Sequence, residues 1–169
     1  MAQRKFQSNV RETGLEGQDL KLLLVDENAY DLDYYTEVLR YLGYEVQPVN
    51  SYSEAVATLD REGFDLVIVD QGSTNFEGRS VLSRAVEVDH HVPILVLTRT
   101  ADADCCIEAL DAGACEYVQK PLTTVEVREL VNDYVKPPAL TLASGHRLPF
   151  GMGDGNGEAS DHESLRRAS

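Results

Sequence analysis

Short apolar runs alternate with amphipathic segments over most of the chain. The runs span residues 21–25, 44–49, 65–70, 94–97 and 115–119. Each has the length of a strand, and those at 21–25, 65–70 and 94–97 are too uniformly apolar for a strand with one solvated face. The pattern therefore predicts five strands of a parallel sheet that is covered on both faces.

The segments between the runs have the spacing of amphipathic helices. In the first and last helical segments the apolar side chains recur every three or four residues, at Leu32, Tyr35, Leu39 and Leu42 and at Val127, Leu130, Val131 and Tyr134. Ser53 is the expected N-cap of the second helix. Strict alternation with right-handed crossovers predicts an α/β fold, a doubly wound (βα)5 sandwich of three layers.

The two ends of the chain differ from this middle part. Residues 1–19 are polar and show no period, so we expect a flexible lead-in. Residues 137–169 begin with two prolines and hold five of the 12 glycines, which is typical of a disordered tail or a linker. The folded domain is therefore expected to span residues 20–136.

The net charge of −14 lies entirely in residues 21–135, which carry eight Lys or Arg against 22 Asp or Glu. This balance argues against nucleic-acid binding, because phosphate contacts need clustered cations, and against an anionic membrane surface. We find no apolar run near the ~18 residues of a membrane span and no secretion signal. Three cysteines without a disulfide pattern fit a reducing, cytoplasmic compartment.

Polar side chains follow four of the predicted strands. Asp26 and Glu27 follow the first strand, Asp70 ends the third, Thr98 ends the fourth and Lys120 follows the fifth. Taken singly, these are ordinary helix caps, a strand-end hydroxyl and a solvated lysine. Their joint occurrence favours a functional site, because ligands of doubly wound sheets bind at the carboxyl ends of the strands.

The residue types indicate phosphoryl chemistry. Clustered carboxylates repel one another unless a cation joins them, and oxygen-only ligands suit Mg²⁺. Lys120 adds a second positive charge, so the pocket fits a phosphoryl group. Asp70 is the candidate nucleophile, which would form an aspartyl phosphate, and Thr98 can donate its hydroxyl to a phosphoryl oxygen.

These motifs resemble the receiver domain of bacterial two-component response regulators, the chemotaxis-Y type of flavodoxin-like fold. The resemblance covers residues 20–136 and rests on LLLVDEN at 22–28, DLVIVD at 65–70, ILVLT at 94–98, DAGA at 111–114 and YVQKP at 117–121. It implies the strand order 2-1-3-4-5. It also implies a phosphoacceptor that dephosphorylates itself rather than a classical enzyme.

The resemblance assigns the acceptor site. Asp70 would take the phosphoryl group from a phosphohistidine of a sensor histidine kinase or a histidine phosphotransfer protein. Mg²⁺ would be held by Asp70, by Glu27 directly, by Asp26 through water and by the backbone carbonyl of Gly72. Lys120 would bind a phosphoryl oxygen.

The resemblance also implies a switch pair. On phosphorylation Thr98 would move toward the phosphoryl oxygen, and Tyr117 would rotate inward into the space left. The surface of the fourth helix, fifth strand and fifth helix would then select a downstream protein. A homodimer through the fourth and fifth helices stays open.

Two stretches depart from the family pattern. Arg99 follows Thr98 where the family mostly has a small residue. It is therefore a candidate gate, which narrows the entry of phosphodonors or slows the water that hydrolyses the acyl phosphate. Alternatively, Arg99 pairs with Glu77 or with a carboxylate of the kinase. The loop 71–74 lacks the usual Met-Pro. We therefore expect this loop to be more mobile.

The sequence leaves four hypotheses about function. The chain is a stand-alone switch (or a phosphate carrier or sink in a phosphorelay), or it is the receiver portion of a longer regulator whose output domain is missing. A phosphohydrolase would need a second Asp two residues after Asp70, where Gly72 stands. Nucleotide or flavin binding would need a Gly- or Ser/Thr-rich loop after the first strand, where the acidic pair stands instead.

Overall fold

The computed structural model describes residues 20–135. A single sheet of five parallel strands runs through this part of the chain in the order β2-β1-β3-β4-β5. The strands are β1 (Lys21–Val25), β2 (Glu45–Val49), β3 (Leu66–Asp70), β4 (Ile94–Thr98) and β5 (Glu116–Gln119). The predicted doubly wound fold and its strand order are confirmed.

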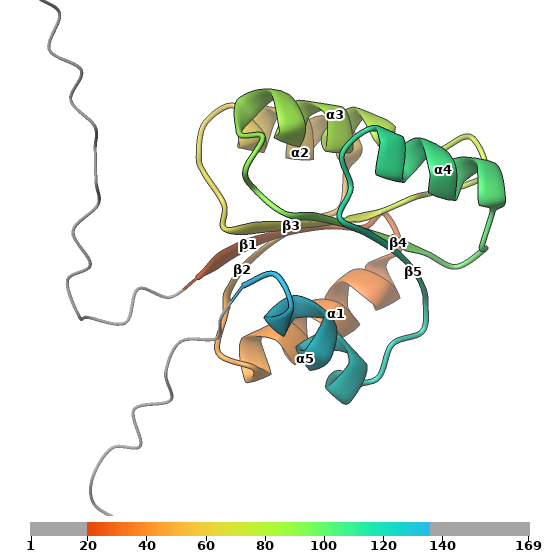
Figure 1. Cartoon of the computed structure of the whole chain (residues 1–169). Helices are drawn as coiled ribbons and strands as arrows, with labels where there is room; N and C mark the ends of the chain where they lie inside the picture. Colours follow the sequence, from red (N-terminus) through yellow and green to blue (C-terminus); the bar gives the residue numbers. More distant parts are fainter. Residues whose placement is uncertain (1–19, 136–169) are drawn as a thin grey trace, which may run out of the picture.

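Five helices cover the sheet. They are α1 (Ala29–Tyr41), α2 (Tyr52–Leu59), α3 (Arg79–Val88), α4 (Ala103–Asp111) and α5 (Thr124–Asn132). Figure 1 shows α2, α3 and α4 on one face of the sheet and α1 and α5 on the other. This arrangement gives the three predicted layers.

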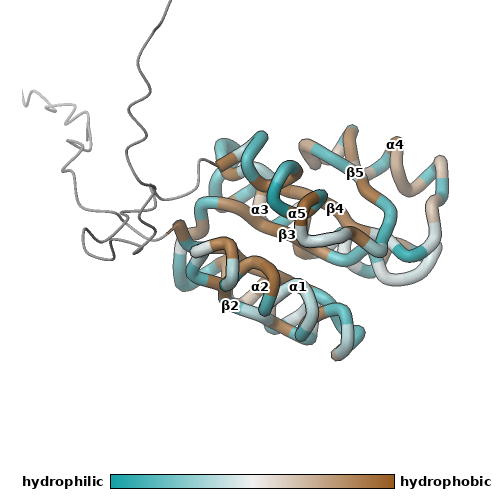
Figure 2. The backbone as a smooth tube through the Cα atoms, turned by 90° about the horizontal axis from the view of Figure 1, so that it is seen from below, coloured by the Kyte–Doolittle hydropathy of each residue, from teal (hydrophilic) through white to brown (hydrophobic). Residues whose placement is uncertain are grey.

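Each face of the sheet has its own hydrophobic core. Side chains alternate along a strand, so Leu23 and Val25 of β1 join the core beneath α2–α4, while Leu22 and Leu24 join the core over α1 and α5. In Figure 2 the strands β3 and β4 are hydrophobic along most of their length. Burial on both faces explains why these strands read as continuous apolar runs.

The predicted start of the second helix is wrong. Ser51, rather than Ser53, is the N-cap of α2, and its hydroxyl accepts a hydrogen bond from the Glu54 backbone N–H. The helix therefore begins at Tyr52, whose ring is buried. This shift brings the Tyr52 hydroxyl to the carboxyl edge of the sheet.

The other end of the predicted pattern differs slightly. Tyr134 was expected within the last helix, but α5 ends at Asn132, and Tyr134 packs against the core from beyond that end. The predicted lead-in 1–19 and tail 137–169 lie outside the described residues, so these boundaries stay predictions. Within residues 20–135 no helix is long and apolar enough to cross a bilayer.

Candidate functional site

The carboxyl edge of the sheet brings the predicted residues together. Val25 pairs with Val69 in the β1–β3 register, so Asp26 and Asp70 leave adjacent strands at the same level. The backbone N–H of Lys120 donates to the Thr98 carbonyl at 2.7 Å, which places the end of β5 beside the end of β4. Parallel pairing therefore gathers side chains that are far apart in the sequence.

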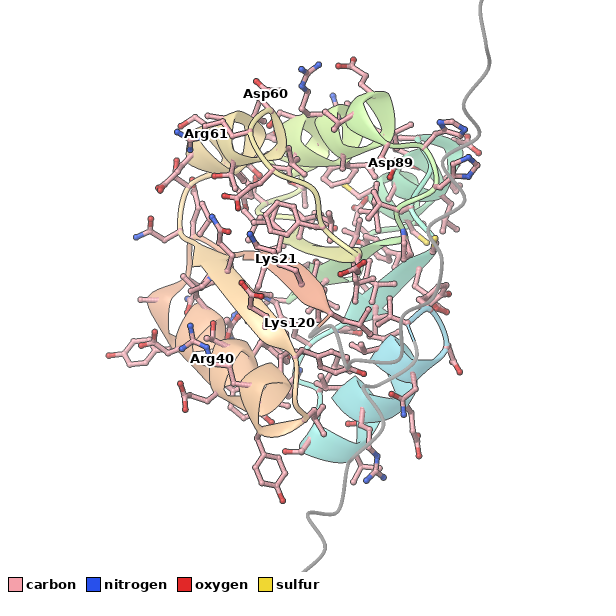
Figure 3. All side chains as sticks on the ribbon, turned by 90° about the vertical axis from the view of Figure 1, so that its left-hand side faces the viewer. Lys21, Arg40, Asp60, Arg61, Asp89 and Lys120 are labelled. Atoms are coloured by element: carbon pink, nitrogen blue, oxygen red, sulfur yellow. The ribbon has the colours of Figure 1, made fainter. Side chains whose placement is uncertain are left out.

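The Lys120 ammonium lies among three carboxylates. Its Nζ is 2.6 Å from Oδ1 of Asp70, 2.8 Å from Oδ2 of Asp26 and 2.8 Å from Oδ2 of Asp31. The side chain is only 3% exposed. Figure 3 labels it near the middle of the view, with Asp60 and Arg61 at the upper edge. Burial alone would lower the pKa of Lys120, but the three carboxylates outweigh burial and raise it, so the lysine stays charged.

Asp31 is a site residue that the sequence reasoning missed. It lies in the first turn of α1, where the Asn28 side chain caps the helix by accepting hydrogen bonds from the N–H groups of Tyr30 and Asp31. Burial would raise the pKa of Asp31, but hydrogen bonds from Lys120 and Arg99 outweigh it and lower the pKa. The sequence signal is weak, because Asp31 lies within the first helical turn and not at the end of a strand.

Asp26 and Asp70 are each oriented by a backbone N–H. The Asn28 N–H donates to Oδ1 of Asp26 at 2.9 Å, and the Gly72 N–H donates to Oδ2 of Asp70 at 2.8 Å. Burial raises the pKa of Asp26 in spite of its hydrogen bond with Lys120. The buried anion therefore gains from any further cation at this edge.

The donor set fits Mg²⁺ in chemistry, although it is not preassembled. Asp26 and Asp70 leave adjacent strands at the same level, and Glu27 follows Asp26 directly in the chain. Such oxygen donors are the ligands that Mg²⁺ prefers. Nevertheless, no three His, Cys, Asp or Glu side chains in the described part already stand close enough to hold a metal ion. Lys120 contacts both aspartates, and Glu27 is exposed.

Hydrogen bonds brace the loop after β3, which was expected to be mobile. The Ser73 N–H and hydroxyl both donate to the Glu77 carboxylate at 2.6 Å, and the Gln71 amide donates to the Ser73 carbonyl at 2.8 Å. Gly72 has φ +85°, and a Cβ there would lie 2.4 Å from Oε2 of Glu77 and 3.0 Å from the Tyr52 hydroxyl. The positive φ therefore favours glycine at position 72, and a side chain there would displace the Glu77 carboxylate.

The switch pair is held by local partners. The Thr98 hydroxyl is buried, donates to the Thr100 carbonyl at 2.8 Å and accepts from the Thr100 N–H at 3.1 Å. The Tyr117 hydroxyl donates to Oε1 of Gln71 and accepts from the Asp102 N–H, the N-cap of α4, at 3.3 Å. Thr98 makes no hydrogen bond with Asp70, while Tyr117 already points inward.

The partner of the Tyr117 hydroxyl is a buried side chain, and the rotation of Tyr117 on phosphorylation stays a prediction. Gln71 is 0% exposed, and its amide oxygen would lack a partner inside the domain without the Tyr117 hydroxyl. The sequence reasoning missed this role, because Gln71 was treated as part of a polar loop. A polar residue at the end of a buried strand was the available signal.

Replacing Gln71 by leucine is expected to remove the hydrogen-bond acceptor of the Tyr117 hydroxyl. The hydrogen bond between this hydroxyl and the Asp102 N–H at the start of α4 should then weaken. The cost in the free energy of unfolding should be about 1–2 kcal/mol, since a buried hydroxyl loses its acceptor. Hydrogen exchange at the Asp102 amide should accelerate. The matched control is Gln119→Leu on the exposed side of β5, and equal exchange in both variants would show that Gln71 does not hold the tyrosine.

Arg99 lies at the rim of the site, with its side chain 61% exposed. Its Nε donates to Oδ2 of Asp31 at 2.8 Å and its Nη2 donates to Oδ1 at 2.5 Å. The alternative pairing with Glu77 is therefore wrong, since Glu77 binds Ser73 instead. The gating role of Arg99 stays a prediction.

Comparison with known proteins identifies this arrangement. The family profile described as the response regulator receiver domain matches residues 22–132, more than half of the chain. The chain belongs to this family. Receiver domains of two-component response regulators act as phosphoacceptors, and phosphorylation switches them.

The curated relatives of this receiver domain are longer proteins. The transcriptional regulatory protein ZraR of Salmonella typhimurium is 30% identical over 139 residues, which cover 79% of this chain and 31% of ZraR. The regulatory protein VanRc of Enterococcus gallinarum is 31% identical over 107 residues, which cover 63% of this chain and 46% of VanRc. The chain thus spans less than half the length of these relatives.

Solved receiver domains share the fold. A CheY-like receiver domain protein from Methanospirillum hungatei has a TM-score of 0.65 and 26% identity over 69% of this chain and 93% of that one. The receiver domain of the sensor histidine kinase PA1611 from Pseudomonas aeruginosa has a TM-score of 0.62 and 26% identity over 69% of this chain and 98% of that one. That second structure has a magnesium ion coordinated in its active-site cleft.

Proposed function

We propose that Asp70 of this receiver domain accepts a phosphoryl group from a phosphohistidine of a sensor histidine kinase or a histidine phosphotransfer protein, with Mg²⁺ as cofactor. The observation that carries the proposal is the contact between Lys120 Nζ and Oδ1 of Asp70 at 2.6 Å, with Oδ2 held by the Gly72 N–H. The carboxylate is thereby oriented beside a permanent cation at the edge of the sheet. Such preorganisation lowers the barrier to phosphoryl transfer.

The transfer forms one bond and breaks another. A carboxylate oxygen of Asp70 attacks phosphorus as the bond from phosphorus to the donor's imidazole nitrogen breaks, and that nitrogen keeps the electron pair. Lys120 neutralises the charge on a phosphoryl oxygen. The Thr98 hydroxyl, which now donates to Thr100, instead donates to the bound phosphoryl group.

Four groups of this chain would hold the metal ion: the carboxylates of Asp26, Glu27 and Asp70 and the backbone carbonyl of Gly72. When bound, Mg²⁺ supplies positive charge that offsets the phosphoryl oxygens. The magnesium in the PA1611 receiver domain supports this part of the proposal.

The output would pass through the face formed by α4, β5 and α5 to a downstream protein or to a second copy of the chain. The hydrogen bond from the Asp102 N–H, at the N-cap of α4, to the Tyr117 hydroxyl supports this route. Exposed Ile107 and Leu110 on α4 offer apolar contact area. The longer relatives favour the receiver portion of a larger regulator over a carrier or sink in a phosphorelay.

Incubation with acetyl phosphate, with and without Mg²⁺, followed by intact mass measurement tests the acceptor. We expect one phosphoryl adduct that requires Mg²⁺ and is absent from Asp70→Asn. Asp65→Asn is the matched control, because Asp65 precedes the opposite end of β3 and binds the Lys21 N–H. Equal labelling of wild type and Asp70→Asn would refute the assignment of Asp70.

A further inference from the structure

Asp31 contacts both cations of the site, and the proposed function assigns it no task. Its Oδ2 accepts hydrogen bonds from Lys120 Nζ and from Arg99 Nε, both at 2.8 Å. Its side chain is 14% exposed, so water screens these contacts only in part. One carboxylate oxygen is thus shared between the lysine that faces Asp70 and the arginine at the rim.

Asp31 competes with the phosphoryl group for Lys120. The ammonium has three N–H donors, and it faces Asp26, Asp31 and Asp70. To bind a phosphoryl oxygen while it still faces the attacking carboxylate of Asp70, Lys120 has to weaken its contact with Asp26 or with Asp31. Asp26 is the poorer choice, because its side chain is only 3% exposed and would lose the cation that balances it.

Because Arg99 also binds Asp31, Lys120 can lose its contact with Asp31. Its planar guanidinium binds both oxygens of Asp31, a geometry that a lysine does not provide. The hydrogen bonds to Asp31 raise the pKa of Arg99, and the charges of Asp26 and Asp70 add to this, so the guanidinium also lies in the field of the phosphoacceptor site. Asp31 therefore keeps a cation when Lys120 turns to the phosphoryl group.

We propose that Arg99 is a positioning residue that acts through Asp31: by pairing with this carboxylate it leaves Lys120 available to the incoming phosphoryl group. The inference rests on the proposed function and deepens it. Arg99 then increases the rate of phosphorylation and does not block entry to the site. The two roles predict opposite changes in the labelling rate.

The test compares Arg99→Gln with the double variant that also carries Asp31→Asn, and it is read by the rate of labelling with acetyl phosphate in Mg²⁺. Arg99→Gln should slow labelling roughly fivefold to tenfold, because Asp31 then binds Lys120 alone and its charge faces the anionic donor. The double variant with Asp31→Asn should return to within about twofold of the wild-type rate, since the competing carboxylate is gone. The exposed Arg79, paired with Glu108 between α3 and α4, supplies the control Arg79→Gln, whose rate should not change.

A second measurement avoids the metal ion. In metal-free protein the side-chain ¹⁵Nζ resonance of Lys120 should shift in Arg99→Gln and shift little in Arg79→Gln. Faster labelling of Arg99→Gln would establish a gate and overturn the inference, as would an unchanged rate or a double variant as slow as Arg99→Gln. If wild type takes no phosphoryl group on Asp70, the proposed function itself fails, whereas normal wild-type labelling with any of these results refutes the inference alone.

Discussion

Lys120→Met is expected to lose about 3–5 kcal/mol of unfolding free energy at neutral pH and to label at least about 100-fold more slowly. The loss of stability follows because three neighbouring carboxylates lose the buried cation that balances them. The loss of rate follows because one preorganised charge next to the developing phosphoryl charge is removed. Urea denaturation and acetyl phosphate labelling measure the two effects.

The loss of unfolding free energy in Lys120→Met should depend on pH. Lys120 lowers the pKa of Asp31 below its ordinary 3.8, so the stability from that pair is present above 3.8 and is lost as the pH falls through the folded value. Asp26 has a raised pKa, so it binds a proton more readily in the folded state and relieves the repulsion at acid pH. The variant should therefore approach wild type only as the pH falls below 3.8, where Asp31 loses its charge in both proteins.

Lys21→Met is the matched control for the lysine variant. Lys21 pairs with Glu62 at the other end of the sheet, and both side chains are partly exposed. An exposed pair contributes about 0–1 kcal/mol, so the control should unfold close to wild type and label normally. A Lys120→Met variant as stable as this control would show that the carboxylates do not depend on the lysine.

Gly78→Ala is expected to cost about 3 kcal/mol of unfolding free energy and to lower the labelling rate. A Cβ at Gly78 would lie 2.2 Å from the Asp70 backbone carbonyl and 3.1 Å from Cγ2 of Val69. Gly78 is the N-cap of α3, so relief of the clash has to move either the helix or the strand that carries Asp70. Urea denaturation gives the first effect and acetyl phosphate labelling the second.

Gly63→Ala is the control for the glycine variant. A Cβ at Gly63 has no atom within 4 Å, so this substitution should change the unfolding free energy by no more than about 0.5 kcal/mol. Equal unfolding free energies for the two alanine variants would show that α3 can shift without a loss of stability.

The fold could be predicted from the sequence because each signal it depends on is local. Strand length, apolar runs and helical spacing are properties of short segments, and the parallel topology follows from their alternation. The same logic places Asp26, Asp70, Thr98 and Lys120, since a side chain at a strand end is positioned by the sheet itself.

The residues that were missed depend on how helices and loops pack. Asp31 reaches Lys120 because α1 begins at the rim of the sheet, and Tyr52 reaches Asp70 because Ser51 starts α2 earlier than expected. Gln71 looks like a loop residue until its amide is found inside the domain. No pattern of local hydropathy fixes the direction of such side chains, since tertiary contacts decide it.

The place of Lys120 in the chain has a consequence for biosynthesis. The lysine comes 94 positions after Asp26, so a nascent polypeptide carries its acidic residues long before their counter-charge leaves the ribosome. The fifth strand and the ammonium that follows it arrive together, and pairing of β5 with β4 delivers both. Under the proposed function, Asp70 would therefore gain its neighbouring cation only once the sheet is complete.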